Sequence, residues 1–162
     1  MRRIMIVLLI AALLGTTSLR PADAAGIRYA PPTVTLTLGS QTYTPGADLD
    51  WRYTLYNGND QPLDLTFPTS QVYDLVLWHG ATVVARWSTG KAFADIVTAR
   101  SVGMGETMEL TGSWKLPGNL ASGDYRLQFS LASTTTEPTD AGTDFTVAKP
   151  GVSGLRAGLT TG

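Results

Sequence analysis

The chain of 162 residues has no cysteine and only one histidine. Without cysteine it can form no disulfide, no thiolate zinc site and no thiol nucleophile. A single histidine excludes metal sites built on histidine pairs, and we expect this residue, His79, to lie in an exposed turn rather than in a catalytic triad. Only 15% of the residues are charged, so the dense basic stripe that binds nucleic acid is missing. These absences predict a protein that is not an enzyme and that uses no metal or cofactor.

The first 24 residues have the features of a secretory signal peptide. Arg2 and Arg3 precede an unbroken apolar run over residues 4–14, and an A-x-A cleavage pattern stands at residues 22–24. The apolar run is well short of the roughly 20 residues that span a bilayer. We therefore expect cleavage after Ala24 and a periplasmic or extracellular chain, with a short uncleaved anchor as the alternative. Cleavage removes three arginines and one aspartate, which changes the formal net charge from −1 to −3, so we expect neither nucleic acid nor a membrane as a partner.

Apolar and polar residues alternate with a period of two along most of the remaining chain, which is typical of half-buried antiparallel strands. Turn-forming residues separate these segments at the short intervals of a sandwich or barrel, for example in the run Asn57-Gly58-Asn59-Asp60, whose residue types tolerate positive φ angles. We predict one all-β domain over residues 25–148, followed by a disordered, glycine-rich tail at 149–162. The eight or nine expected strands include residues 33–38, 49–55, 63–67, 73–78, 83–87, 107–114, 125–131 and 145–147.

Residues 73–78 and 83–87 are apolar on both faces, so we expect two central strands, or two strands with a second covered face, joined by a tight hairpin at His79-Gly80. The stretch 91–100 is ambiguous: it predicts irregular structure, or one turn of helix with Phe93, Ile96 and Val97 on its inner face.

One local pattern favours an immunoglobulin-like antiparallel sandwich over a closed barrel. Gly123-Asp124-Tyr125 opens a strand, as the tyrosine corner of such sandwiches does, and Leu127 stands where a cysteine often does. We expect the Tyr125 hydroxyl to bond to backbone upstream, and packing around Leu127 to replace the missing disulfide.

The motifs that would carry chemistry are incomplete. The S-x-x-K pattern at 88–91 lacks the other elements of penicillin-binding enzymes. Asp48 and Asp50 share a strand face but belong to no calcium loop, and Glu106 and Glu109 would face opposite sides of one strand. None of these patterns predicts a reaction.

Several short patterns, taken in order along the chain, resemble the intracellular proteinase inhibitor (BsuPI) family. The first is Gln71-x-Tyr73-Asp74 followed by an apolar strand. A strand ending in Arg86-Trp87-Ser88 and then Phe93 comes next, with Ala85 where the family often has tryptophan. Residues 105–106, Trp114 and the 123–125 pattern look like the later family positions, so that the resemblance covers about residues 51–132. The positions that match the family, and that look structural, are Gln71, Tyr73, Asp74, Trp87, Ser88, Phe93, Trp114, Gly123 and Tyr125.

The resemblance implies an immunoglobulin-like sandwich that binds and inhibits serine proteases of the subtilisin type. It implies a protein partner of the class of secreted serine proteases, and we expect a monomer. Asp74 and Ser88 look like polar groups that bond to neighbouring backbone. The signal peptide stands against a cytoplasmic target.

An inhibitor of this kind presents a stiff, convex loop with an apolar side chain for the enzyme's pocket. Two loops are candidates, and proline stiffens the first while glycines loosen the second. The first is Leu116, Pro117, Gly118, Asn119 and Leu120; the second is Val102, Gly103, Met104 and Gly105.

The alternative function is a non-inhibitory interaction or accessory module of the cell envelope. A surface patch of tryptophan and tyrosine would favour that alternative, and Trp78 is the aromatic residue we most expect outside the core. A rigid protruding loop would favour inhibition.

Overall fold

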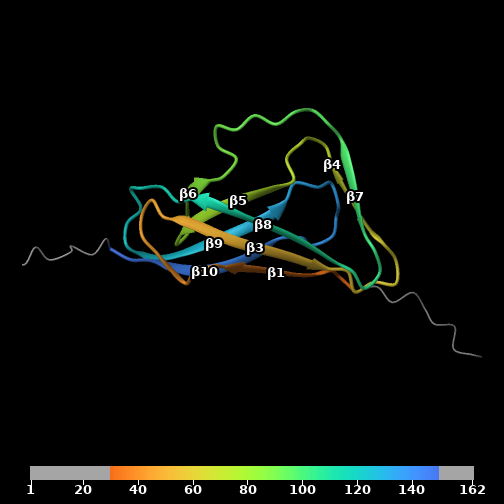
Figure 1. The fold of residues 1–162 in the computed structure, drawn as a ribbon, viewed down its shortest axis with the longest axis horizontal. Helices are drawn as coiled ribbons and strands as arrows, with labels where there is room; N and C mark the ends of the chain where they lie inside the picture. The colour runs from red at the N-terminus through yellow and green to blue at the C-terminus, as the bar shows by residue number, and fades with distance from the viewer. Residues whose placement is uncertain (1–29, 150–162) are drawn as a thin grey trace, which may run out of the picture.

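The computed structural model describes residues 30–149 and consists, over that range, of ten β-strands and no helix (Figure 1). No segment of this range is a helix long and apolar enough to cross a membrane. The strands are β1 (Thr33–Leu38), β2 (Thr42–Tyr43), β3 (Asp48–Tyr56), β4 (Leu63–Phe67), β5 (Tyr73–His79), β6 (Thr82–Arg86), β7 (Thr98–Val102), β8 (Thr107–Lys115), β9 (Gly123–Leu131) and β10 (Ala141–Val147).

The strands form two stacked sheets and one separate ribbon. One sheet has the order β1-β3-β8, and the other has the order β2-β10-β9-β5-β6. Every pairing is antiparallel except that of β10 with the two-residue β2. β4 and β7 pair only with each other and rise from the sandwich (Figure 1). The chain is therefore an all-β, immunoglobulin-like sandwich, as the alternation predicts.

The core lies between the two sheets because one face of each strand is apolar. On β3, Leu49, Trp51, Tyr53 and Leu55 are buried, while the residues between them point outward. The ring of Tyr53 stacks on Phe129 of β9 with centroids 4.0 Å apart. Burial of each such large side chain contributes about 1.5–3 kcal/mol. Because the chain has no disulfide, this packing holds the two sheets together.

The tyrosine corner is present. The Tyr125 hydroxyl donates a hydrogen bond of 2.9 Å to the carbonyl oxygen of Ala121, four residues upstream. Leu127 is fully buried at the position where related sandwiches often place a cysteine.

The strand predictions were wrong at β6 and β7. β6 is the edge strand of its sheet rather than a central one, and Val83 and Val84 are exposed. β7 was not predicted, because four of its five residues are exposed and only Val102 faces the core.

One turn differs from expectation. The β5–β6 hairpin turns at Gly80-Ala81, since His79 still pairs with Thr82. The run from Asn57 to Asp60 turns without a positive φ, although its residue types tolerate one. The predicted signal peptide at 1–24 and residues 150–162 of the predicted tail lie outside the described residues.

Candidate functional site

Three loops could meet a protein partner, and they lie on three different sides of the molecule (Figure 1). The β8–β9 loop is at one end of the sandwich and the β7–β8 turn is at the opposite end. The β6–β7 loop arches over the top, above the β4–β7 ribbon.

The β8–β9 loop does not present the apolar side chain expected of it. Leu116 is only 2% exposed, and its amide donates a hydrogen bond of 2.9 Å to the carbonyl of Ala47. The inward alternation of β8 continues past the end of the strand, so the side chain at position 116 enters the core. Leu120 is half-buried against the same core, so of the five residues predicted as the contact only Gly118 and Asn119 are exposed. The choice of Leu116 as a pocket-filling residue was wrong.

The β7–β8 turn exposes Met104, as expected, but its glycines do not loosen it. The amide of Glu106 donates to the carbonyl of Gly103 at 3.0 Å, and the amide of Gly103 donates to the Glu106 carboxylate at 2.9 Å. Gly105 has a φ of 70°, a value that glycine adopts without strain. The turn is tight and holds out one large side chain, that of Met104, which is 66% exposed.

Asn57 fixes this turn from beneath, a role that the sequence analysis missed. The residue is fully buried, and its Nδ2 donates to the carbonyls of Gln61 and Val102 at 2.8 and 2.9 Å. Its backbone carbonyl accepts from the amide of Gly105 at 2.9 Å. The only signal in the sequence is an asparagine at the end of a strand, and such residues commonly bond to nearby backbone.

The β6–β7 loop is irregular and exposed, and it turns at Asp95, where the amide of Ile96 donates to the carbonyl of Ala94 at 2.8 Å. Residues 91–97 have no regular secondary structure, and every residue from Ala94 to Ser101 is exposed, so the loop and most of β7 form one continuous run. Ile96 is 57% exposed and Val97 70% exposed. Irregular structure, one of the two expectations for this stretch, is confirmed over residues 91–97. The alternative of a helical turn was wrong, and of Phe93, Ile96 and Val97 only Phe93 is partly buried.

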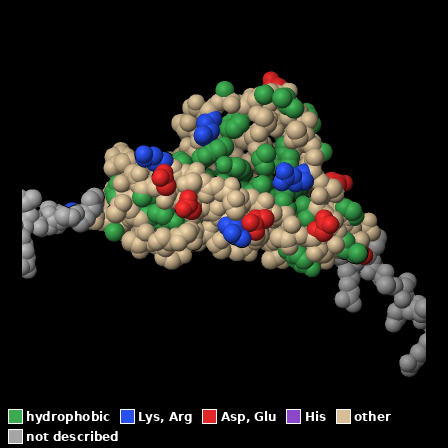
Figure 2. All heavy atoms as spheres, viewed as in Figure 1, with side chains coloured by type: hydrophobic (Ala, Val, Ile, Leu, Met, Phe, Trp, Pro, Cys, Tyr) green, Lys and Arg blue, Asp and Glu red, His purple; other side chains and the backbone are tan. Residues whose placement is uncertain are grey.

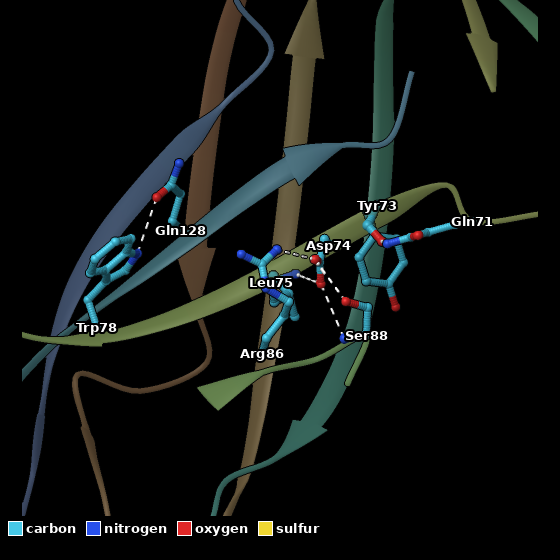
Figure 3. Close-up of polar contacts among 8 residues, drawn as sticks. All are labelled: Gln71, Tyr73, Asp74, Leu75, Trp78, Arg86, Ser88 and Gln128. Atoms are coloured by element: carbon cyan, nitrogen blue, oxygen red, sulfur yellow. Dashed lines mark hydrogen bonds and ion pairs between the residues drawn. The ribbon is translucent and has the colours of Figure 1, made fainter. Parts of the chain in front are cut away.

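Asp74 fixes the root of the β6–β7 loop, as Figure 3 shows. Its carboxylate accepts hydrogen bonds from the Ser88 amide at 3.2 Å and the Ser88 hydroxyl at 2.9 Å. It also accepts from the amide of Leu75 at 2.8 Å and pairs with the guanidinium of Arg86 at 2.7 Å. The side chain of Asp74 is only 14% exposed, so the bonds that hold the first residues of the loop to β5 are largely shielded from water.

An aromatic stack supports the same root. The rings of Tyr73 and Trp87 lie 4.5 Å apart, and Phe93 continues the stack 6.1 Å beyond Trp87. The ammonium group of Lys91 lies 4.4 Å from the centre of the Trp87 ring, at cation–π distance. Tyr73 and Trp87 are partly buried and pack against the core, and this burial raises the pKa of Tyr73 above its ordinary value.

Ser70 holds the middle of the loop. Its amide donates to the carbonyl of Ala94 at 2.8 Å, and its hydroxyl accepts from the amide of Ala94 at 2.9 Å. The loop is thus fixed at its root and at Ala94, while Ile96 and Val97 project beyond the second anchor. The sequence analysis marked Ile96 and Val97 as inward-facing residues, and it gave Ser70 no role in holding the loop.

The remaining family-like positions have structural surroundings. The side-chain amide of Gln71 donates to the carbonyl of Tyr73 at 3.1 Å, and Trp114 packs half-buried against the core. A Cβ at Gly123 would lie 3.2 Å from Nε2 of His79, which stacks on Tyr125. Trp78 is half-buried and donates to Gln128 at 3.2 Å, so it offers no open aromatic platform (Figure 3). Within residues 30–149, no three acidic, histidine or cysteine side chains are grouped to hold a metal ion.

Comparison with solved structures shows distant likeness only. The sporulation control protein of Bacillus subtilis is 14% identical, with a TM-score of 0.48, over 76% of this chain and 51% of its own. This chain thus spans about half the length of that protein. A CARDB domain from Pyrococcus furiosus, solved with di-metal ions, is 15% identical, with a TM-score of 0.42, over 74% of this chain and 96% of that domain.

No curated protein sequence matches the chain. The family model described as intracellular proteinase inhibitor matches residues 36–136, which is more than half of the sequence and contains β5, the Asp74 cluster and all three loops. The chain therefore belongs to the BsuPI family of intracellular proteinase inhibitors.

Proposed function

We propose that this protein inhibits a serine protease of the subtilisin type outside the cell, and that the β6–β7 loop is its main contact. The observation that carries the assignment of the loop is the continuous exposed run from Ala94 to Ser101, anchored at its root by Asp74 and at Ala94 by Ser70.

The β6–β7 loop is preorganised, which favours binding. An extended segment bound by an enzyme loses backbone and side-chain freedom, and the affinity suffers unless the free protein has already lost it. Here the stack on Trp87 and the bonds to Asp74 and Ser70 restrict the loop before any partner arrives. An extended segment can also pair its free backbone groups with a strand of the enzyme, a common way to bind a peptide.

The other two loops suit this task less well. The β8–β9 loop turns its apolar residues inward, and the β7–β8 turn offers a single methionine on a tight bend. A stable protein–protein contact buries about 800 Å² on each partner, which a long exposed run with neighbouring surface supplies more readily than one side chain.

The test is an inhibition assay with residues 25–162 against subtilisin, with a metalloprotease as the comparison. Val97→Asp places a charge in the proposed contact, and Met104→Asp is the matched control, because both side chains are about two thirds or more exposed. We expect Val97→Asp to weaken inhibition at least tenfold and Met104→Asp to leave it unchanged. The reverse pattern would move the site to the β7–β8 turn, and no inhibition by the unaltered chain would end the proposal.

Export is a separate part of the proposal, supported by the pattern of residues 1–24. Expression of the full chain in a bacterial host should yield a periplasmic or secreted product whose first residue is Ala25. A cytoplasmic product that retains Met1 would overturn this part and leave the inhibitory loop in place.

A further inference from the structure

A small apolar hollow adjoins the exposed end of the β6–β7 loop. It has a volume of about 210 Å³ and is lined by Phe67, Val72, Thr98, Ala99 and Arg100. Phe67 is buried and Val72 half-buried, while the three β7 residues that line it are exposed. Since Val97 directly precedes β7, any partner seated on Val97 also faces this hollow.

Arg100 stands out among the described arginines because no carboxylate pairs with it. Arg52, Arg86 and Arg126 each lie within 3.2 Å of an acidic oxygen, but no ion pair involves Arg100 within residues 30–149. In the view of Figure 2, apolar side chains gather over the upper half of the molecule, with basic side chains on both sides of them. Arg100 beside the apolar lining of the hollow is complementary to a carboxylate that lies next to an apolar side chain.

We propose that this hollow is a second contact site for the same protease, and that it receives an apolar side chain flanked by an acidic residue on the enzyme. The inference rests on the proposed inhibitory function and adds a determinant of specificity to it. Insertion of an apolar side chain removes the hollow's apolar lining from water, while the free guanidinium of Arg100 finds the partner that this chain does not provide. A protease without an acidic residue at that place would leave Arg100 covered and unpaired, which costs affinity.

The two chemical parts of the site predict different kinetics. Arg100 is exposed, so its charge acts mainly on the rate of encounter and on its dependence on salt. The hollow contributes only after the two proteins are in contact. A substitution in this chain that fills the hollow should therefore raise the rate of dissociation. Arg100→Gln and Ala99→Trp separate these two effects.

The experiment measures association and dissociation with immobilised, catalytically inactive subtilisin at low and high ionic strength. Arg126→Gln is the matched control, because it removes the same charge from an exposed pair on β9, away from the β4–β7 ribbon. We expect Arg100→Gln to slow association about three- to tenfold at low salt, with the gap closing at high salt, while Arg126→Gln has little effect. We expect Ala99→Trp to raise the dissociation rate about tenfold, and the urea midpoint of each variant checks that it is folded.

The possible outcomes separate this inference from the one on which it rests. If Val97→Asp abolishes binding while Arg100→Gln and Ala99→Trp bind like the unaltered chain, the hollow is not a contact and the inhibitory loop stands. If the unaltered chain binds no subtilisin-type protease, both proposals fall. If sedimentation shows that the chain forms a dimer that Arg100→Gln dissociates, the hollow faces a second copy and the protease is the wrong occupant.

Discussion

Replacement of Asp74 by alanine tests whether the root of the β6–β7 loop is fixed as described. The substitution removes the acceptor of both hydrogen bonds from Ser88 and of the bond from the Leu75 amide. Hydrogen bonds to a charged group contribute about 1.5–3 kcal/mol each when they are shielded from water. The Arg86 side chain is 50% exposed, so that ion pair adds only about 0–1 kcal/mol. Because the cluster is partly shielded, we expect an overall loss of about 2–4 kcal/mol in the free energy of unfolding.

The assay is urea unfolding followed by tryptophan fluorescence, with Asp144→Ala as the control. Asp144 also pairs with an arginine, but its side chain is 70% exposed, and we expect a loss of about 0–1 kcal/mol. A double-mutant cycle between Asp74→Ala and Ser88→Ala should give a coupling energy of about 1 kcal/mol or more. If the loop is the protease contact, Asp74→Ala also weakens inhibition by about tenfold, which corresponds to about 1.4 kcal/mol. Equal losses for Asp74→Ala and Asp144→Ala would refute the reasoning.

Three further predictions concern the core and the β7–β8 turn. Asn57→Asp turns a carboxylate toward carbonyls that now accept from Nδ2, and should lower the free energy of unfolding by about 3 kcal/mol or more, measured in urea at pH 7; a loss below about 1 kcal/mol contradicts the role given to this residue. Gly112→Ala would place a Cβ 2.6 Å from the ring of Trp51, its partner on the neighbouring strand of the same sheet, so we expect a loss of about 1–3 kcal/mol and a lower melting temperature. An unchanged melting temperature would show that the Trp51 ring moves aside without cost. Burial, and to a smaller extent the charge of Asp140, raises the pKa of Tyr53 above its ordinary value of 10.0, so the folded state keeps a proton that the unfolded chain releases. Stability should therefore fall as the pH rises above about 10, less steeply in Tyr53→Phe, and equal slopes in the two proteins would exclude Tyr53 as a cause.

The strands that face the core could be predicted from the sequence because burial imposes alternation on them. β3 and β9 are examples, since every second residue of each is buried. β7 gave no such signal, because it pairs with β4 above the sandwich and turns four exposed residues to solvent. The edge position of β6 was also hidden, since its valines read as core while they lie exposed at the side of the sheet.

The candidate site was less accessible from sequence, because its parts meet only through the fold. Asp74 and Ser88 could be recognised as polar groups bonding near strands, but their contact with each other spans 14 positions. The alternation of β8, continued by one residue past the end of the strand, predicts that Leu116 is buried. Ile96 and Val97 are apolar, as core residues are, and only the path of the loop in the folded chain shows that they are exposed.

The exposed apolar pair of the β6–β7 loop, Ile96 and Val97, lies between the Ser70 anchor at Ala94 and strand β7. Residues up to Ala94 are held by Ser70, and residues from Thr98 onward are paired with β4. Hydrolysis of the peptide bond between Ile96 and Val97 would therefore create two new chain ends that remain where the intact chain had placed them. A nicked molecule would keep its shape, because its two fragments stay joined by the pairing of β3 with β8 and of β5 with β9 as well as by that of β4 with β7.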